Sequence, residues 1–199
     1  MVLKYGAYFF GRIPLFRKIL EIDRDGSYAL RVAEKPGLLR TCAMLFAHSG
    51  DSWFWGLGTL ILWLIGNTFW KRWSVYELFW ISLLAALVIS LKFTIRRRRP
   101  EGEWGAIYRN TDPHSFPSGH AARAFLIAVI ASFCGPTWLA VILWIWAPLV
   151  SLARVAMGVH YISDILAGAL VGVIVALVGI QISEPIFTFI GHWVGFMLW

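Results

Sequence analysis

The sequence predicts an all-α membrane protein: a polytopic membrane helix bundle with about six transmembrane helices and an N-terminal interfacial amphipathic helix. Three observations predict this fold class. Hydrophobic residues make up 59% of the chain, charged residues make up 15%, and the mean hydropathy is +0.68. The apolar residues gather in runs that approach the roughly 20 residues needed to cross a bilayer. Twelve Trp and fourteen Phe suit helix ends that lie at lipid interfaces.

The N-terminal segment, residues 1–24, is expected to be an amphipathic helix on the membrane surface. It mixes aromatic residues with basic ones, among them Lys4, Arg12, Arg17 and Lys18, and Pro14 interrupts its apolar run. The following apolar segment, residues 36–49, is too short to cross, because a span needs about 20 residues. A helix that began near Ser27 would be long enough, and it gives a sixth span.

Five clearer spans follow. They are Trp53–Trp70, Val75–Ile95, Ser118–Cys134, Pro136–Gly158 and Tyr161–Ile182. A Lys-Arg pair closes the first of them, and a polar loop, residues 96–117, separates the second from the third. Gly135 and Pro136 mark a helix stop and a helix start, because proline suits the first helical turn. The whole chain, residues 1–199, is therefore expected to be one membrane-embedded domain.

Two of the spans carry residues with a structural meaning. Pro148 is expected to kink its helix. The last span has Gly168, Gly172 and Ala176 on one face, and small residues at this spacing permit another helix to approach closely. The apolar tail, residues 183–199, is short and is expected to lie at the interface.

The alternation of spans assigns an orientation. Residues near 50, 92–117 and 151–160 fall on one side of the membrane. The opposite side carries a larger share of the basic residues that no functional site requires, namely Lys4, Arg12, Arg17, Lys18, Arg24, Arg31, Lys35, Lys71 and Arg72. By the positive-inside rule, the first side is expected to face outward.

The formal net charge of +7 fits a membrane protein better than a nucleic-acid-binding one. Its basic residues flank hydrophobic spans and form no soluble basic face, so the sequence predicts no nucleic-acid partner and favours an anionic lipid. Cys42 and Cys134 lie far apart in apolar runs, without the spacing of a zinc site. Both are interpreted as packing residues.

Two residues near the start of the last span favour nucleophilic chemistry. His160 and Asp164 are four residues apart and share one face of a helix. A carboxylate there can hold one imidazole nitrogen protonated and leave the other as a nucleophile. The alternative is a packing histidine beside a membrane-boundary aspartate. Because a carboxylate next to a span is costly, the functional reading is favoured.

The Pro117-Ser118-Gly119-His120 stretch is typical of a helix start. Free N–H groups at such a start attract phosphate oxygens, and Gly119 would allow a close approach of the backbone. His120 would lie one turn in, where it could act as a general acid. The alternative is an ordinary helix cap with an incidental histidine.

Fixed cations complete the candidate site. A phosphoryl group in transfer spreads charge over three oxygens, and arginine can bind two of them at once. The favoured cations are Lys92, Arg99 and Arg154. The run Arg96, Arg97 and Arg98 is interpreted as a basic flank beside a span. His48 and Asp51, at a span end on the same side, are interpreted as candidates to line the entrance, and His114 is interpreted as incidental. The acidic residues Glu101, Glu103 and Asp112 have no convincing metal-ligand spacing, so no metal site is predicted.

The three segments resemble the signature of the type-2 phosphatidic acid phosphatase (PAP2) family. That signature is Lys-x6-Arg-Pro, then Pro-Ser-Gly-His, then Ser-Arg-x5-His-x3-Asp, and the match runs from Lys92 to Asp164. The resemblance implies a six-helix membrane fold and a dephosphorylation through phosphohistidine that needs neither metal nor other cofactor. One position departs from the signature: Ala153 replaces the serine before the arginine, which removes a possible hydroxyl contact to phosphate.

The resemblance also implies roles for individual residues. His160 would be the nucleophile, His120 the acid and Asp164 the orienting carboxylate. The phosphate would be bound by Lys92, Arg99, Ser118, Gly119 and Arg154.

The function expected from these features is a lipid phosphatase of the bacterial plasma membrane, with its site on the outer side. The candidate substrates are undecaprenyl pyrophosphate, phosphatidylglycerol phosphate, phosphatidic acid and lipid A 1-phosphate, and the first two are favoured. A lipid-to-lipid phosphotransferase and a non-catalytic protein that binds or transports an anionic lipid are the alternatives. The sequence leaves open the lipid, the preference for monophosphate or pyrophosphate, and the oligomeric state.

Overall fold

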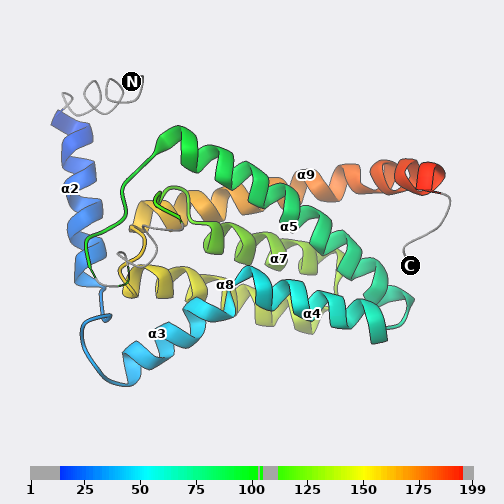
Figure 1. Ribbon diagram of the computed structural model, residues 1–199, viewed down its shortest axis with the longest axis horizontal. Coiled ribbons are helices and arrows are strands. Elements are labelled where there is room, and N and C mark those ends of the chain that lie inside the picture. Colours follow the sequence, from blue (N-terminus) through cyan, green and yellow to red (C-terminus); the bar gives the residue numbers. More distant parts are fainter. Residues whose placement is uncertain (1–13, 103, 105–111, 195–199) are drawn as a thin grey trace.

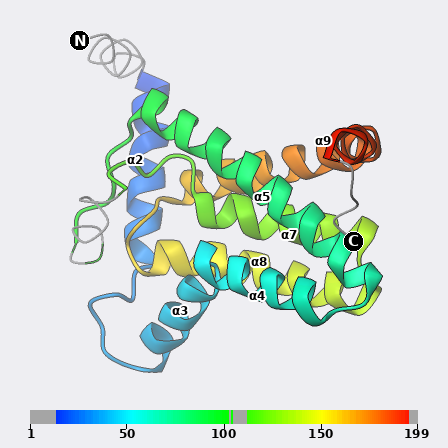
Figure 2. The same cartoon turned by 45° about the vertical axis from the view of Figure 1, so that its right-hand side comes forward.

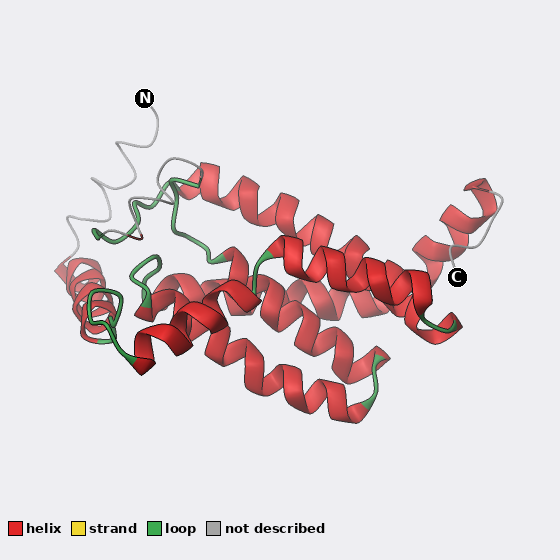
Figure 3. Ribbon diagram, turned by 60° about the horizontal axis from the view of Figure 1, so that its bottom comes forward, coloured by secondary structure: helices red, strands yellow, loops and turns green. Residues whose placement is uncertain are grey.

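The computed structural model describes residues 14–102, 104 and 112–194, and this part of the chain is almost entirely helical. The helices are α2 (Pro14–Ala29), α3 (Leu38–Ser49), α4 (Ser52–Ile65), α5 (Thr68–Ile95), α7 (Gly119–Cys134), α8 (Thr137–Ala156) and α9 (Ile162–Val194). Within the described ranges no strand forms, and one isolated bridge joins Arg98 to His114 (Figure 3). The all-α prediction is confirmed.

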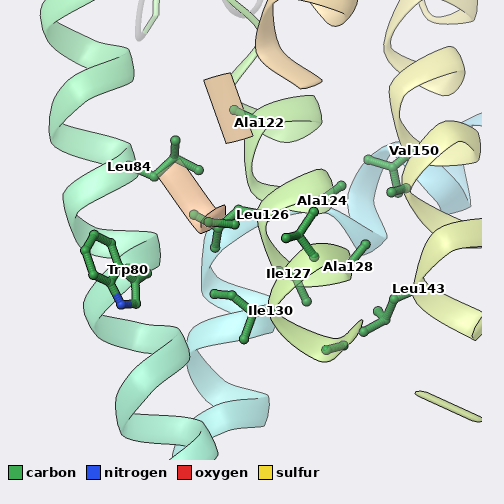
Figure 4. Close-up of a cluster of buried hydrophobic side chains, with 14 of the residues drawn as sticks. Trp80, Leu84, Ala122, Ala124, Leu126, Ile127, Ala128, Ile130, Leu143 and Val150 are labelled. Atoms are coloured by element: carbon green, nitrogen blue, oxygen red, sulfur yellow. The ribbon is translucent and has the colours of Figure 1, made fainter. Parts of the chain in front are cut away.

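Helix α7 is the centre of the bundle, and α5, α8 and α9 surround it (Figure 1). Ten of its residues are buried, from Ala121 to Ala124 and from Leu126 to Ala131. Figure 4 shows Leu126 and Ile130 of α7 facing Trp80 and Leu84 of α5, with Leu143 of α8 on the opposite side. Because α7 carries the Ser-Gly-His segment at its first turn, the most deeply packed helix positions that segment.

The predicted small-residue face of α9 packs directly on α7. A Cβ atom at Gly168 would overlap with the backbone oxygen of Ser118, and one at Gly172 would overlap with the backbone of Ala122. Ala176, one turn further, is fully buried. Only glycine permits this approach, so the prediction of close helix packing is confirmed.

In the part of the chain that the structure describes, three helices are long and apolar enough to cross a bilayer, namely α5, α8 and the Ile162–Phe189 part of α9. The α4 and α7 helices are apolar but shorter, with 14 and 16 residues. Large apolar side chains point outward from the bundle, among them Leu64, Ile89, Ile145 and Leu170. Such an outer surface is suited to lipid, and the protein is an integral membrane protein.

Several predicted boundaries are wrong. No continuous helix runs from Ser27 to Ser49, because α2 contains Ser27, ends at Ala29 and is followed by a turn region; α3 then has only 12 residues. The sixth span predicted there does not form. The predicted break at 71–74 lies instead at Gly66 and Asn67, so the Lys-Arg pair belongs to α5.

The structure describes part of the N-terminal segment and most of the C-terminal tail. Pro14 begins α2, as suits a residue of the first helical turn. Of the expected surface segment 1–24, residues 1–13 lie outside the described part. Helix α2 runs across the end of the bundle (Figure 1). The tail continues α9 through Pro185 to Val194, and residues 195–199 are not described.

Candidate active site

The three sequence motifs meet at one end of the bundle, beside α2 (Figure 2). Lys92 comes from the last turn of α5, and Gly119 and His120 come from the first turn of α7. Arg154 ends α8, and His160 lies in the junction before α9. These residues and Arg99 line one cavity of about 350 Å³. Segments separated by up to 68 positions, from Lys92 to His160, therefore share one pocket.

The two ring nitrogens of His160 face different partners. Nε2 lies 3.3 Å from Nη1 of Arg99, and Nδ1 lies 3.5 Å from Oδ2 of Asp164. Arginine can only donate, so Nε2 is the acceptor and carries the lone pair. Nδ1 then carries the proton and points to the carboxylate, at a separation longer than an ordinary hydrogen bond. The ring therefore presents the lone pair of Nε2 to Arg99.

Burial lowers the pKa of His160 well below its ordinary value, and the charges of Arg99, Arg154 and Lys92 act in the same direction. The side chain is 1% exposed. The environment therefore favours the neutral imidazole at neutral pH, the form with a free lone pair.

The free energy of unfolding is expected to fall when the pH is lowered from 7 to 5. In the unfolded chain His160 takes up a proton below about pH 6.5, whereas the buried ring stays neutral. The unfolded state then binds more protons, so stability falls by up to about 1.4 kcal/mol per pH unit for this group. Thermal unfolding in detergent at both pH values measures the effect. A His160→Gln variant should lose less stability on acidification, and an equal loss would contradict the explanation.

The predicted cations are buried beside the histidine. Lys92 is 6% exposed, Arg99 is 4% exposed and Arg154 is 2% exposed. Arg99 is held in place by Nη1 donating to the backbone oxygen of Val159 at 2.8 Å and by Nε donating to the backbone oxygen of Asp112 at 2.7 Å. Buried cations fixed in this way form a strong site for an anion.

The Asp112 carboxylate lies among these cations. Its Oδ2 accepts hydrogen bonds from Nζ of Lys92 and, at 2.8 Å, from Nη2 of Arg99. Burial would raise the pKa of Asp112, but the hydrogen bond from Lys92 and the charges of Lys92 and Arg99 outweigh it, and the pKa is lowered. An incoming phosphate would compete with this carboxylate for the same donors. No sequence spacing pointed to this role.

Asp112→Asn is expected to tighten the binding of inorganic vanadate by roughly tenfold, or about 1.4 kcal/mol. The substitution removes a competing negative charge, and a hydrogen bond to a charged group contributes about 1.5–3 kcal/mol. The inhibition constant of vanadate, or its affinity by calorimetry, measures the change. Glu101→Gln is the matched control, because it removes one exposed carboxylate nearby. Equal effects of the two substitutions would show that the change in vanadate affinity comes from net charge alone and not from the contact of Asp112 with Lys92 and Arg99.

The start of α7 is fixed to the start of α9. The N–H of Ser118 donates to the backbone oxygen of Asp164 at 2.9 Å, and its hydroxyl accepts from the N–H of Ala121 at 3.4 Å. Ser118 is fully buried and does not line the cavity, whereas Gly119 does. Of the two residues predicted to bind phosphate at this helix start, the structure brings Gly119 to the cavity.

His120 has a carboxylate partner that sequence reasoning did not assign. Nε2 of His120 lies 2.8 Å from Oδ1 of Asp51, and Nδ1 of His48 lies 3.1 Å from Oδ2 of the same carboxylate. Burial would raise the pKa of Asp51, but hydrogen bonds from the two histidines outweigh it and hold the pKa below its ordinary value. Asp51 is therefore a charged partner of His120, and neither it nor His48 lines the cavity.

The interpretation of Arg97 as a basic flank is wrong. Its Nη1 donates to Oδ1 of Asp164 at 2.8 Å and its Nη2 donates to Oδ2 of Asp23 at 2.6 Å. The run of four arginines hid this role, because sequence alone does not show which member turns inward. Arg96 and Arg98 are exposed, as a flank requires.

The remaining predicted positions lie apart from the cavity. Ala153 packs in a buried apolar cluster with Ala43, Ala47 and Met157 and does not line the cavity. The ring of His114 stacks edge-on against Phe93. Among the residues that the structure describes, no group of three His, Cys, Asp or Glu side chains is arranged to hold a metal ion.

Comparison with known proteins identifies the family. The sequence model of the PAP2 superfamily matches residues 74–187, which is more than half of the 199-residue chain. The chain belongs to the PAP2 superfamily. The matched region contains Lys92, His120 and His160, so the PAP2 resemblance noted in the sequence is confirmed.

Individual proteins that are similar to this chain are consistent with its membership of the PAP2 superfamily. The crystal structure of Aquifex aeolicus LpxE is similar, with a TM-score of 0.63 and 30% identity over 81% of this chain and 94% of that chain. The transmembrane PAP2-type phosphatidylglycerolphosphate phosphatase of Bacillus subtilis shares the fold, with a TM-score of 0.64 and 24% identity over 85% and 88% of the two chains. Lipid A 1-phosphatase of Porphyromonas gingivalis is 31% identical over 121 residues, which cover 59% of this chain and about a quarter, 25%, of that protein.

Proposed function

We propose that this PAP2 protein is a lipid phosphate phosphatase that transfers a phosphoryl group from a lipid to His160 and then to water. The observation that carries the proposal is the set of residues that line one cavity. His160, His120 and the cations Lys92, Arg99 and Arg154 all line it, and Nε2 of His160 lies 3.3 Å from Nη1 of Arg99. A site that only bound an anion would need the cations but neither histidine.

The proposed reaction has two steps. In the first, the lone pair of His160 Nε2 attacks phosphorus, the bond from phosphorus to the lipid oxygen breaks, and His120 donates a proton to that oxygen. In the second, water attacks phosphorus, the phosphorus–nitrogen bond breaks, and His120 accepts the proton of the water. Lys92, Arg99 and Arg154 stabilise the charge on the phosphoryl oxygens in both steps without a metal ion.

A lipid substrate is supported by the apolar wall of the cavity. Ile81, Leu84, Val88 and Ile89 of α5 line it together with Lys92. The stretch from residue 81 to residue 92 rises by roughly 16 Å along a helix. An apolar tail lying along α5 would therefore place its phosphate at the cations. The relatives named above act on lipid A and phosphatidylglycerol phosphate.

Among lipid phosphates, an isoprenyl pyrophosphate or phosphatidylglycerol phosphate is the substrate we favour. The sequence placed the cavity on the outer side of the bacterial plasma membrane by counting residues 1–35 on the opposite side. In the structure α2, with Arg17, Lys18 and Arg24, packs at the end of the bundle where the cavity lies, so the positive-inside rule no longer supports that orientation. A substrate in the leaflet at that end would reach the site from within the bilayer.

A phosphate-release panel tests the function. Purified protein in detergent is given one of four lipids: undecaprenyl pyrophosphate, phosphatidylglycerol phosphate, phosphatidic acid or lipid A 1-phosphate. Each reaction is run with and without EDTA, and with and without vanadate. We expect free phosphate from at least one lipid, resistance to EDTA and inhibition by vanadate, which mimics the five-coordinate transition state. Loss of activity in EDTA would overturn the mechanism. Phosphate found on a second lipid would indicate a phosphotransferase. No reaction with any of the four lipids would favour a protein that only binds or transports an anionic lipid.

A further inference from the structure

Helix α2 contacts the start of α9 through buried polar groups. The Asp23 carboxylate accepts hydrogen bonds from the Ser163 backbone N–H at 2.9 Å and from the Ser163 hydroxyl at 2.6 Å. Four residues later on the same face of α2, the Ser27 hydroxyl accepts from the N–H of Ile162 at 2.9 Å. The first N–H groups of a helix have no partner within it. Two side chains of α2 therefore cap α9 from a distant part of the sequence.

Arg97 joins this contact to the candidate active site. Its guanidinium bridges Oδ2 of Asp23 and Oδ1 of Asp164, at 2.6 Å and 2.8 Å. It also lies over the ring of Tyr161, 4.0 Å from the ring centroid. The side chain of Asp164 is completely buried and that of Asp23 is 9% exposed, so solvent ions screen this network only weakly.

The network fixes the plane of the Asp164 carboxylate. Oδ1 is held by Arg97, and Oδ2 accepts from the N–H of Tyr161 at 2.9 Å while it faces Nδ1 of His160 at 3.5 Å. Without Arg97, Oδ1 would lose the cation that holds it, and the carboxylate could rotate away from the imidazole. Without Asp23, Arg97 would lose its second anchor and α9 would lose a cap.

We infer that Asp23 and Arg97 are positioning residues, through which helix α2 holds Asp164 and thereby the ring of His160 in the attacking orientation. The inference deepens the proposed function and rests on His160 being the nucleophile. Asp23 lies before the region matched by the family model, residues 74–187, so the contribution of α2 is read from the structure of this chain and not from the motif.

Kinetics of Asp23→Asn and Arg97→Gln test the inference. The turnover number is expected to fall by about 10- to 100-fold, because a displacement of a catalytic group by about 1 Å can cause such a loss. The Michaelis constant should change little, since the cations that bind phosphate are untouched. Asp25→Asn is the matched control: it removes the same charge from α2, but Asp25 is exposed and pairs only with Arg24 among the described contacts. A turnover number for Asp23→Asn equal to that of the control would overturn the inference.

A double-mutant cycle separates positioning from a general loss of structure. In an Asp164→Asn background, Asp23→Asn should have no further effect on turnover, because its effect passes through Asp164. If Asp23→Asn lowers turnover by the same factor in both backgrounds, Asp23 acts only as a structural contact and the inference fails.

The histidine ring provides a readout that needs no activity. In spectra of protein with ¹⁵N-labelled histidine, the His160 ring signals are assigned by their loss in His160→Gln. They should shift in Asp23→Asn and stay at the wild-type position in Asp25→Asn. Unchanged His160 signals in Asp23→Asn would refute the positioning network even if the protein is an active phosphatase. Shifted signals in a protein that releases no phosphate would support the network and remove the proposed function.

Discussion

His160→Gln is expected to lower the rate of phosphate release by at least roughly 10⁴-fold, as removal of a nucleophile does in other hydrolases. The amide keeps a polar side chain of similar length but has no basic lone pair to attack phosphorus. Lys92, Arg99 and Arg154 remain, so the variant should still bind vanadate. The turnover number on the best lipid of the panel measures the first effect, and calorimetry measures the second.

His114→Gln is the control for this prediction. Its ring packs edge-on against Phe93, with centroids 5.5 Å apart, and does not line the cavity. It should keep wild-type turnover within the error of the assay. Acid-labile phosphate attached to the wild-type protein, and absent from His160→Gln, would identify the intermediate. Comparable turnover in wild type and His160→Gln would show that another group is the nucleophile.

The sequence predicted the residues that line the cavity better than the residues that hold those side chains in position. Lys92, Arg99, His120, Arg154 and His160 lie in motifs whose spacing limits where they can go, and all five line the cavity. Ser118 is the exception, since its hydroxyl and N–H are used to fix helix starts. The motif shows which residue types the chemistry needs, but not which of them the backbone uses for itself.

Apart from Asp164, the carboxylates around the site could not be assigned their partners from the sequence. Asp51 belongs to the α3–α4 turn, Asp112 to the loop before α7 and Asp23 to α2, and each contacts a residue at least 13 positions away. Such pairings depend on how helices pack, which local pattern does not encode. Arg97 turns inward after Arg96, which ends α5 with φ of 53° in the left-handed region. Nothing in four successive arginines signals that turn.

The helix boundaries were likewise predicted correctly at some positions and incorrectly at others. The start at Ser118 and the stop at Gly135 were predicted from capping residues, and α7 runs from Gly119 to Cys134 with these two residues as its caps. The break between α4 and α5 was misplaced because the Lys-Arg pair was a stronger polar signal than Gly66-Asn67. Asn67 is nonetheless the cap, since its side chain accepts from the N–H of Trp70 at 3.2 Å. A Cβ at Gly66 would lie 2.7 Å from the Cβ of Trp70, so the turn needs glycine for space.

Gly172→Leu is expected to prevent the folded bundle from forming, with a loss in the free energy of unfolding of more than about 4 kcal/mol. Even a Cβ at this position would overlap with the backbone of Ala122, and backbone cannot move aside as a flexible side chain can. The larger side chain would push α9 away from α7. Because Ser118 N–H donates to the Asp164 oxygen across the same interface, the site should be lost with the packing.

Gly58→Leu on α4 is the matched control, because no atom lies within 4 Å of a Cβ built there. Leucine also favours the helix over glycine by up to about 1 kcal/mol. The control should therefore keep or slightly raise the thermal unfolding midpoint in detergent, while Gly172→Leu should elute as aggregate or unfold far below wild type. If both variants behaved alike, glycine at 172 would be dispensable, and the close contact of α7 with α9 could not be what holds the two halves of the site together.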